Sequence, residues 1–187
     1  MLMVGLGNAG KNIVKLFKPH TKNYKIIVLD EDEGIPKQDS VEKYDEQPIK
    51  LTQKGLKSHS EATLFVCGGG KIAGASLRVL EALESFKTTV VYLVPDLEFA
   101  STREQKRHRV HFGVLQEYTR SGKIDKMVIL DNKTLFTHAG AGTTLKYYDK
   151  VNYFIYSTFQ NLLYCQHVDP DFGKLHEKKD ISRISTI

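Results

Sequence analysis

Glycines that follow apolar runs are the residues whose type and spacing most clearly predict chemistry in this chain. The stretch Gly68-Gly69-Gly70-Lys71-Ile72-Ala73-Gly74 follows the apolar run 64–67 and precedes a helical pattern. Consecutive glycines are costly to order, so a chain retains them where another group approaches the backbone closely. At a strand-to-helix junction that group is usually a phosphate, because free N–H groups and the positive end of the helix dipole face it. Taken alone, this stretch is equally consistent with a tight turn that binds nothing.

A second glycine stretch, Gly5-Leu6-Gly7-Asn8-Ala9-Gly10, follows the short apolar run 1–4. It matches the G-x-G-x-x-G pattern of dinucleotide-binding proteins. Asp30 ends the next strand pattern about 20 residues later, where it could bind a ribose hydroxyl. The stretch is also one residue short of a P-loop, but Asn12 stands where a P-loop needs Ser or Thr to hold magnesium. The pattern therefore favours a dinucleotide site over a P-loop.

Strand and helix patterns alternate along the chain, and this order determines where the glycine loops lie. The near-continuous apolar strands predict an α/β fold, namely a three-layer, Rossmann-like, mostly parallel sheet with helices on both faces. Ser101 has capping-box spacing and opens a polar helix to about Arg120. A long central helix at the C-terminal end runs to about Cys165 and carries a wide apolar stripe. The loops that follow the strands share the carboxyl edge of the sheet, where such folds bind ligands.

Composition limits the class of protein. The 187 residues are 41% hydrophobic and 26% charged with a net charge of +5, which is typical of one globular domain. Two widely spaced cysteines in apolar runs indicate free thiols and a cytoplasmic location. No apolar run is long enough for a membrane span, and the start of the chain lacks a signal-peptide pattern. The seven histidines show no metal-ligand spacing. The basic run 103–109 favours a solvated helix face over a nucleic-acid site, because no aromatic residues interleave with it.

Taken together, the loops resemble the nucleotide-binding domain of the tubulin/FtsZ family, in the same order along the chain. Residues 5–14 resemble its first glycine loop, with Asn12 at the start of the first helix, and residues 65–75 resemble its GGGTGTGA phosphate loop. Residues 128–135 resemble its IPNDKLL segment, and residues 166–173 resemble NVDFADV, the loop after the central helix. A dinucleotide fold explains neither the second glycine loop nor the long helix. The chain departs from the family where Lys71-Ile72-Ala73 replaces Thr-Gly-Thr, and it ends where the family's second domain would begin.

The resemblance implies a guanine-nucleotide-binding protein. It assigns residues 1–165 to the nucleotide-binding domain and 166–187 to a catalytic-type loop and polar tail. Its ligands would be GTP or GDP with Mg²⁺, and its subunits would associate head to tail into filaments. Asp169 and Asp171 would complete GTP hydrolysis on the neighbouring subunit by orienting water. One tyrosine of the long helix could stack on the base. The candidate nucleotide-binding residues are Gly5, Gly7, Asn8, Ala9, Gly10, Asn12, Asp30, Gly68, Gly69, Gly70, Lys71, Gly74, Glu98, Asn132 and Asp149.

Two alternatives remain open from the sequence. A degenerate relative would keep the glycine loops for folding only and act as a structural or interaction module. A dinucleotide-binding Rossmann protein would use Asp30 and bind NAD. Binding measurements with GTP, GDP and NAD separate these possibilities.

Overall fold

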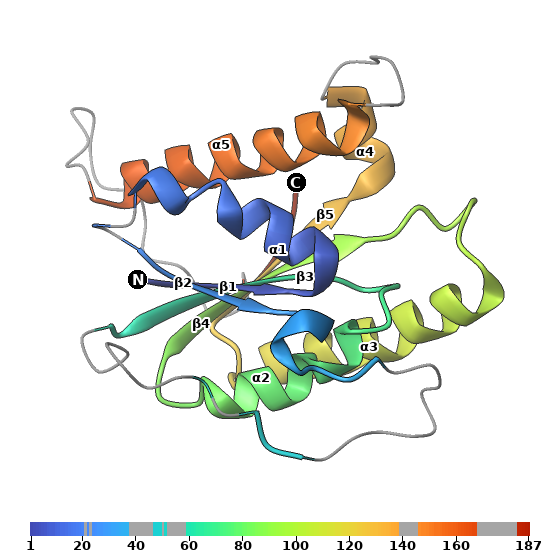
Figure 1. The fold of residues 1–187 in the computed structure, drawn as a ribbon, viewed down its shortest axis with the longest axis horizontal. Helices are drawn as coiled ribbons and strands as arrows, with labels where there is room; N and C mark the ends of the chain where they lie inside the picture. The colour runs from blue at the N-terminus through green and yellow to red at the C-terminus, as the bar shows by residue number, and fades with distance from the viewer. Residues whose placement is uncertain are drawn as a thin grey trace.

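A computed structural model describes residues 1–20, 22, 24–37, 47–49, 51, 59–138, 146–167 and 183–187. Within these residues, six parallel strands form one sheet in the order β2-β1-β3-β4-β5-β6 (Figure 1). The strands are β1 (Leu2–Leu6), β2 (Lys25–Leu29), β3 (Glu61–Cys67), β4 (Lys87–Val94), β5 (Lys126–Asp131) and β6 (Ile184–Thr186). This sheet confirms the predicted α/β, Rossmann-like class.

Helices cover both faces of the sheet. The α-helices are α1 (Gly7–Lys15), α2 (Ser76–Ala82), α3 (Thr102–Arg120), α4 (Asn132–His138) and α5 (Tyr147–His167). Short 3-10 helices are η1 (Lys18–His20), η2 (Glu31–Glu33) and η4 (Ala73–Ala75). In Figure 1, α1, α4 and α5 lie on one side of the sheet and α2 and α3 on the other. The 21-residue helix α5 is the predicted long helix.

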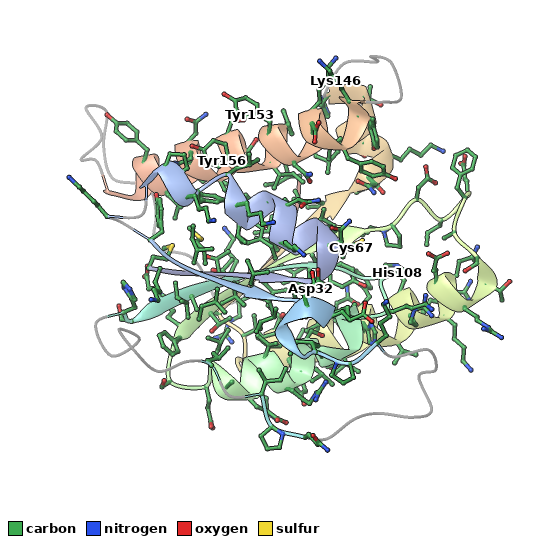
Figure 2. The ribbon with its side chains drawn as sticks, in the orientation of Figure 1. Asp32, Cys67, His108, Lys146, Tyr153 and Tyr156 are labelled. Atoms are coloured by element: carbon green, nitrogen blue, oxygen red, sulfur yellow. The ribbon has the colours of Figure 1, made fainter. Side chains whose placement is uncertain are left out.

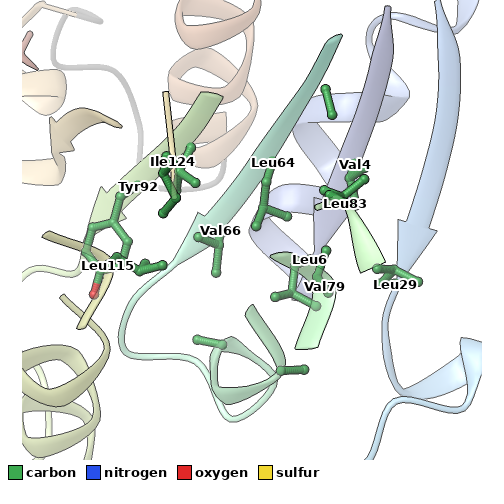
Figure 3. Close-up of a cluster of buried hydrophobic side chains, with 14 of the residues drawn as sticks. Val4, Leu6, Leu29, Leu64, Val66, Val79, Leu83, Tyr92, Leu115 and Ile124 are labelled. Atoms are coloured by element: carbon green, nitrogen blue, oxygen red, sulfur yellow. The ribbon is translucent and has the colours of Figure 1, made fainter. Parts of the chain in front are cut away.

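Each face of the sheet has its own hydrophobic core, because successive side chains of a strand point to opposite faces. Leu64 and Val66 of β3 face α2 and pack with Val79 and Leu83 (Figure 3). Phe65 faces the other way and meets the ring of Phe159 from α5, with ring centroids 5.4 Å apart. Burial on both faces explains why the strand patterns in the sequence are continuous rather than alternating.

Two elements differ from the sequence-based expectation. Residues 132–138 form helix α4, which is capped by Asp131: its Oδ2 accepts hydrogen bonds from the Thr134 N–H at 3.2 Å and the Thr134 hydroxyl at 3.0 Å. Ile184–Thr186, expected in a polar tail, form strand β6 beside β5. Three residues are too few for a periodic pattern to reveal. The predicted catalytic residues Asp169 and Asp171 lie outside the described residues.

Helix α3 confirms one prediction and corrects another. Ser101 and Glu104 form the predicted capping box. The basic run was expected on a solvated face, but Arg107 and His108 are only 6% and 8% exposed. These two residues face the sheet because α3 covers β4. The basic run therefore supplies two residues of the helix face that packs against the sheet. Among the described helices, none has the length and apolar character that crossing a membrane requires.

Candidate functional site

The two glycine loops meet where the connections of the sheet change direction. β1 lies between β2 and β3. The chain leaves β1 through α1 toward β2, then returns to the other side of β1 as β3 and continues into α2. At such a switch point the loops after the two central strands diverge to opposite faces and leave a crevice at their carboxyl ends. The loops after β1 and β3 are the two glycine stretches that the sequence singles out.

A pocket of about 550 Å³ occupies this crevice. Eight of the predicted nucleotide-binding residues line it: Gly7, Asn8, Ala9, Asn12, Asp30, Gly69, Gly70 and Lys71. The volume lies within the range of small-molecule sites. The first turn of α1 lines one wall, so the positive end of that helix dipole faces the pocket. Figure 2 labels Cys67, the last residue of β3, and Asp32, which lies within the 3-10 turn η2 after β2, at this edge of the sheet.

Other glycines of the two loops serve packing. A Cβ on Gly10 would lie 2.3 Å from the backbone oxygen of Phe65, and one on Gly5 would lie 2.5 Å from that of Gly10. These positions let α1 approach β1 and β3 closely. A Cβ on Gly68 would lie 1.7 Å from the hydroxyl oxygen of Tyr92. The residues that line the pocket do not include Gly5, Gly10, Gly68 or Gly74. The close approach of protein atoms explains why the first three of these positions are glycine.

Gly70 and Ile72 show that the pocket is open rather than filled. A Cβ on Gly70 would meet only the Cys67 carbonyl oxygen, at an ordinary 3.5 Å, so no packing constraint requires glycine there. Ile72 stands where the tubulin/FtsZ phosphate loop, which this stretch resembles, has a glycine. Its side chain turns toward Gly7, whose φ is +69°, and a Cβ on Gly7 would lie 3.4 Å from that of Ile72. Ile72 therefore packs against the first loop and becomes part of the wall.

Charged groups surround the opening of the pocket. Lys11 Nζ donates to Asp30 Oδ2 at 3.0 Å and to Asp32 Oδ2 at 3.3 Å, and these bonds raise the pKa of Lys11. Burial opposes ionisation of Asp30, but the hydrogen bonds from Lys11 and from the Glu31 N–H outweigh it and lower its pKa. Asp30 is thus an ionised carboxylate whose charge is already balanced. Lys37 lines the same pocket and pairs with Glu31.

The two carboxylates that line the pocket accept hydrogen bonds from neighbouring protein groups. Asp30 is held by Lys11, and Glu104 Oε2 accepts hydrogen bonds from the Ser101 N–H at 2.8 Å and the Ser101 hydroxyl at 2.7 Å. In the described ranges, no three His, Cys, Asp or Glu side chains gather as a metal would require. A Mg²⁺ ion that accompanies a nucleotide is coordinated largely by phosphate oxygens and water, so it would not require such a cluster.

Three predicted residues lie away from this pocket. Glu98 is exposed and forms an ion pair with Lys133. The Asn132 carbonyl accepts a hydrogen bond from Tyr147 at 3.4 Å, at the start of α4. Asp149 is exposed and lines a neighbouring pocket of about 840 Å³ beside α1, α4 and α5. Both pockets include Asn12 and Asn152, so they adjoin along the contact between α1 and α5.

Helix α5 contributes two residues to the pocket between the glycine loops: Tyr148, one of the tyrosines predicted as a possible base-stacking residue, and Asn152, which was not predicted. Tyr148 is 69% exposed and lines the pocket together with Asn152, one helical turn later. An exposed aromatic ring offers a stacking surface, and an amide both donates and accepts hydrogen bonds. The sequence signal was the four-residue spacing of a tyrosine and an asparagine, which places both on one face of a helix.

Cys67 provides a chemical probe of this pocket. Burial raises the pKa of its thiol, so little thiolate is present at neutral pH, and its side chain lines the pocket. We expect slow alkylation of Cys67 by N-ethylmaleimide and a severalfold further slowing with saturating GDP. A Cys165→Ser variant, which leaves Cys67 as the remaining cysteine, allows the rate to be followed by mass spectrometry. An alkylation rate unchanged by GDP would contradict binding of the nucleotide at this pocket.

Neither the models of known protein families nor the curated proteins include a match to this chain.

Proposed function

We propose that this protein binds a guanine nucleotide, GTP or GDP, with its phosphates between the two glycine loops. One observation carries this proposal: both loops, together with the first turn of α1, line a single open pocket at the switch point of a parallel sheet. Backbone N–H groups and the helix dipole favour an anion there. Lys71 also lines the pocket and adds a cationic side chain, as does Lys37, whose charge is shared with Glu31. The tubulin/FtsZ resemblance of the same loops supports the nucleotide class.

The base would lie against α5. Tyr148 offers an exposed ring beside Asn152, and the adjoining pocket is lined by Asp149. Guanine presents the N1–H and N2–H donors to a carboxylate, whereas adenine presents an acceptor at N1. Asp149, an exposed carboxylate that lines the adjoining pocket together with Asn152, would therefore favour guanine over adenine.

Asp30 distinguishes this proposal from the dinucleotide alternative. In an NAD site the equivalent carboxylate binds ribose hydroxyls. Here Asp30 Oδ2 is held by Lys11 and Oδ1 accepts the Glu31 N–H at 2.9 Å, so the carboxylate serves to anchor α1 to the turn after β2. The alternative of a structural module without nucleotide is less favoured, because Gly70 and Lys71 line a pocket of ligand size.

Calorimetric titration with GTP, GDP, ATP and NAD tests the proposal. We expect one site per chain for GTP and GDP with micromolar or tighter affinity, and binding of ATP and NAD at least about tenfold weaker. Absence of binding by all four would instead support a structural or interaction module. A preference for NAD would support the dinucleotide alternative.

Hydrolysis and head-to-tail filament assembly extend the proposal to the predicted catalytic pair. If Asp169 and Asp171 act on the nucleotide of the next subunit, phosphate release per chain will rise with protein concentration. Asp169→Asn and Asp171→Asn variants should each lose most of this activity and still bind GTP with unchanged affinity. Phosphate release measured at several concentrations tests both points. Equal rates in the variants and the unaltered protein would remove the pair from the mechanism.

A further inference from the structure

A buried arginine of helix α3 forms a hydrogen bond with the second glycine loop. Arg107 is 6% exposed, and its Nε donates a hydrogen bond to the carbonyl oxygen of Gly69 at 3.0 Å. Gly69 and Gly70 line the pocket, whereas Arg107 is not among its lining residues. The arginine thus contacts the loop without lining the pocket itself. A buried guanidinium requires hydrogen-bond acceptors, and this carbonyl is one of them.

Gly68, the residue before Gly69, is held in place by its own contacts. Gly68 N–H donates to the Leu93 carbonyl at 3.0 Å. The Tyr92 hydroxyl lies directly behind Gly68 and is 3.0 Å from Nδ1 of His108, the α3 residue labelled in Figure 2. Rotation of the loop at Gly68 is therefore blocked by packing. Gly69 lies beside Pro95 and Glu104, since a Cβ on it would be 3.3 Å from the Pro95 side chain and 3.5 Å from that of Glu104. Its carbonyl oxygen accepts the hydrogen bond from Arg107, which fixes the orientation of the peptide between Gly69 and Gly70.

Peptide geometry gives this bond a consequence on the pocket side. The carbonyl of Gly69 and the N–H of Gly70 belong to one planar unit and point in opposite directions. With the carbonyl toward α3, the Gly70 N–H points away from α3 and closes a long turn contact, 3.4 Å, to the Cys67 carbonyl. Glycine on both sides makes a peptide flip inexpensive, because positive φ carries no Cβ clash. A flipped peptide would turn the Gly69 carbonyl oxygen toward the pocket, where it would repel a phosphate.

We propose that Arg107 is a positioning residue that selects the phosphate-binding orientation of the Gly69–Gly70 peptide. This inference rests on the proposed function and adds a specific device to it. The arginine contacts no ligand. It keeps a carbonyl oxygen out of the anion site through one hydrogen bond, and its effect therefore falls on the phosphates and not on the base.

The test compares the Arg107→Met variant with Arg109→Met. Arg109 is an exposed arginine two residues later in the same helix. Calorimetry of each variant with guanosine, GDP and GTP separates positioning from general damage. For Arg107→Met we expect GDP and GTP to bind at least about tenfold more weakly. Guanosine affinity should stay within about twofold, because a base-side contact does not depend on the loop peptide. Arg109→Met should bind all three as the unaltered protein does.

Arg107→Lys is the second variant, since it keeps a charged donor that can reach the carbonyl, and it should recover part of the lost GDP affinity. If Arg107→Met does not fold, as judged by circular dichroism, Arg107→Lys and Arg107→Gln carry the same comparison. Equal losses for guanosine and GDP, or no loss for either, would overturn the inference while nucleotide binding by the unaltered protein stands. Failure of the unaltered protein to bind any nucleotide would overturn the proposed function and this inference with it.

Discussion

Replacing Gly10 with alanine is expected to destabilise the protein by about 3 kcal/mol. The added Cβ would lie 2.3 Å from the Phe65 carbonyl oxygen and 3.1 Å from the Gly5 carbonyl carbon, and both are backbone atoms of central strands. Neither strand can move without breaking its hydrogen bonds to its neighbours. Helix α1 would have to shift outward and lose its packing against Phe65. Urea unfolding followed by circular dichroism measures the loss.

Gly113→Ala is the matched control. Gly113 lies within α3, and its Cβ would meet open space. Because glycine in a helix interior is less favourable than alanine, this variant should be more stable by about 0.5–1 kcal/mol. The two substitutions add the same methyl group and have opposite expected signs. A Gly10→Ala protein as stable as the unaltered one would contradict the close packing of α1 on the sheet.

Reversing the charge of Lys71 is expected to weaken GTP binding by about a hundredfold. Lys71 is exposed and lines the pocket beside Gly70, so Lys71→Glu places a carboxylate against the phosphates. The free energy of unfolding should change by less than about 0.5 kcal/mol, because the side chain lies on the surface. Calorimetry at low and high salt measures the effect, and the difference from the unaltered protein should shrink as salt increases.

Arg109→Glu is the control for this variant, since it produces the same change in net charge on an exposed site of α3 that does not line the pocket. A long-range effect of net charge would weaken GTP binding similarly in both. A local phosphate contact weakens it only in Lys71→Glu. Unchanged GTP affinity in Lys71→Glu would remove this lysine from the site.

The sequence was sufficient for the fold and for one wall of the pocket. The apolar runs located the strands β1 to β5 because each contributes side chains to the cores on both faces of the sheet. Glycines at the ends of β1 and β3 marked the loops that line the crevice. The roles of individual glycines could not be separated. Gly10 and Gly70 look alike in the sequence, yet one is required by a backbone atom 55 residues away and the other faces open space.

The features of the site that could not be predicted from the sequence depend on contacts between distant segments of the chain. Arg107 reaches Gly69 across 38 positions of sequence, so it was grouped with its exposed neighbours. Asp30 ends a strand as a ribose-binding residue would, but its partner Lys11 could be found only once α1 was packed beside β2. Glu98 and Asn132 were predicted from the tubulin/FtsZ resemblance alone, and they lie outside the pocket, near the start of α4.

The central claim is that nucleotide phosphates lie between the two glycine loops. Backbone amide shifts in ¹⁵N NMR spectra during a GDP titration test it most directly, because they locate binding without any substitution. We expect the largest shifts at Gly7–Gly10 and Gly69–Ile72, smaller shifts at Tyr148 and Asn152, and none at β6 on the far edge of the sheet. Large shifts elsewhere with none at the glycine loops, or no shifts at all at saturating GDP, would contradict it.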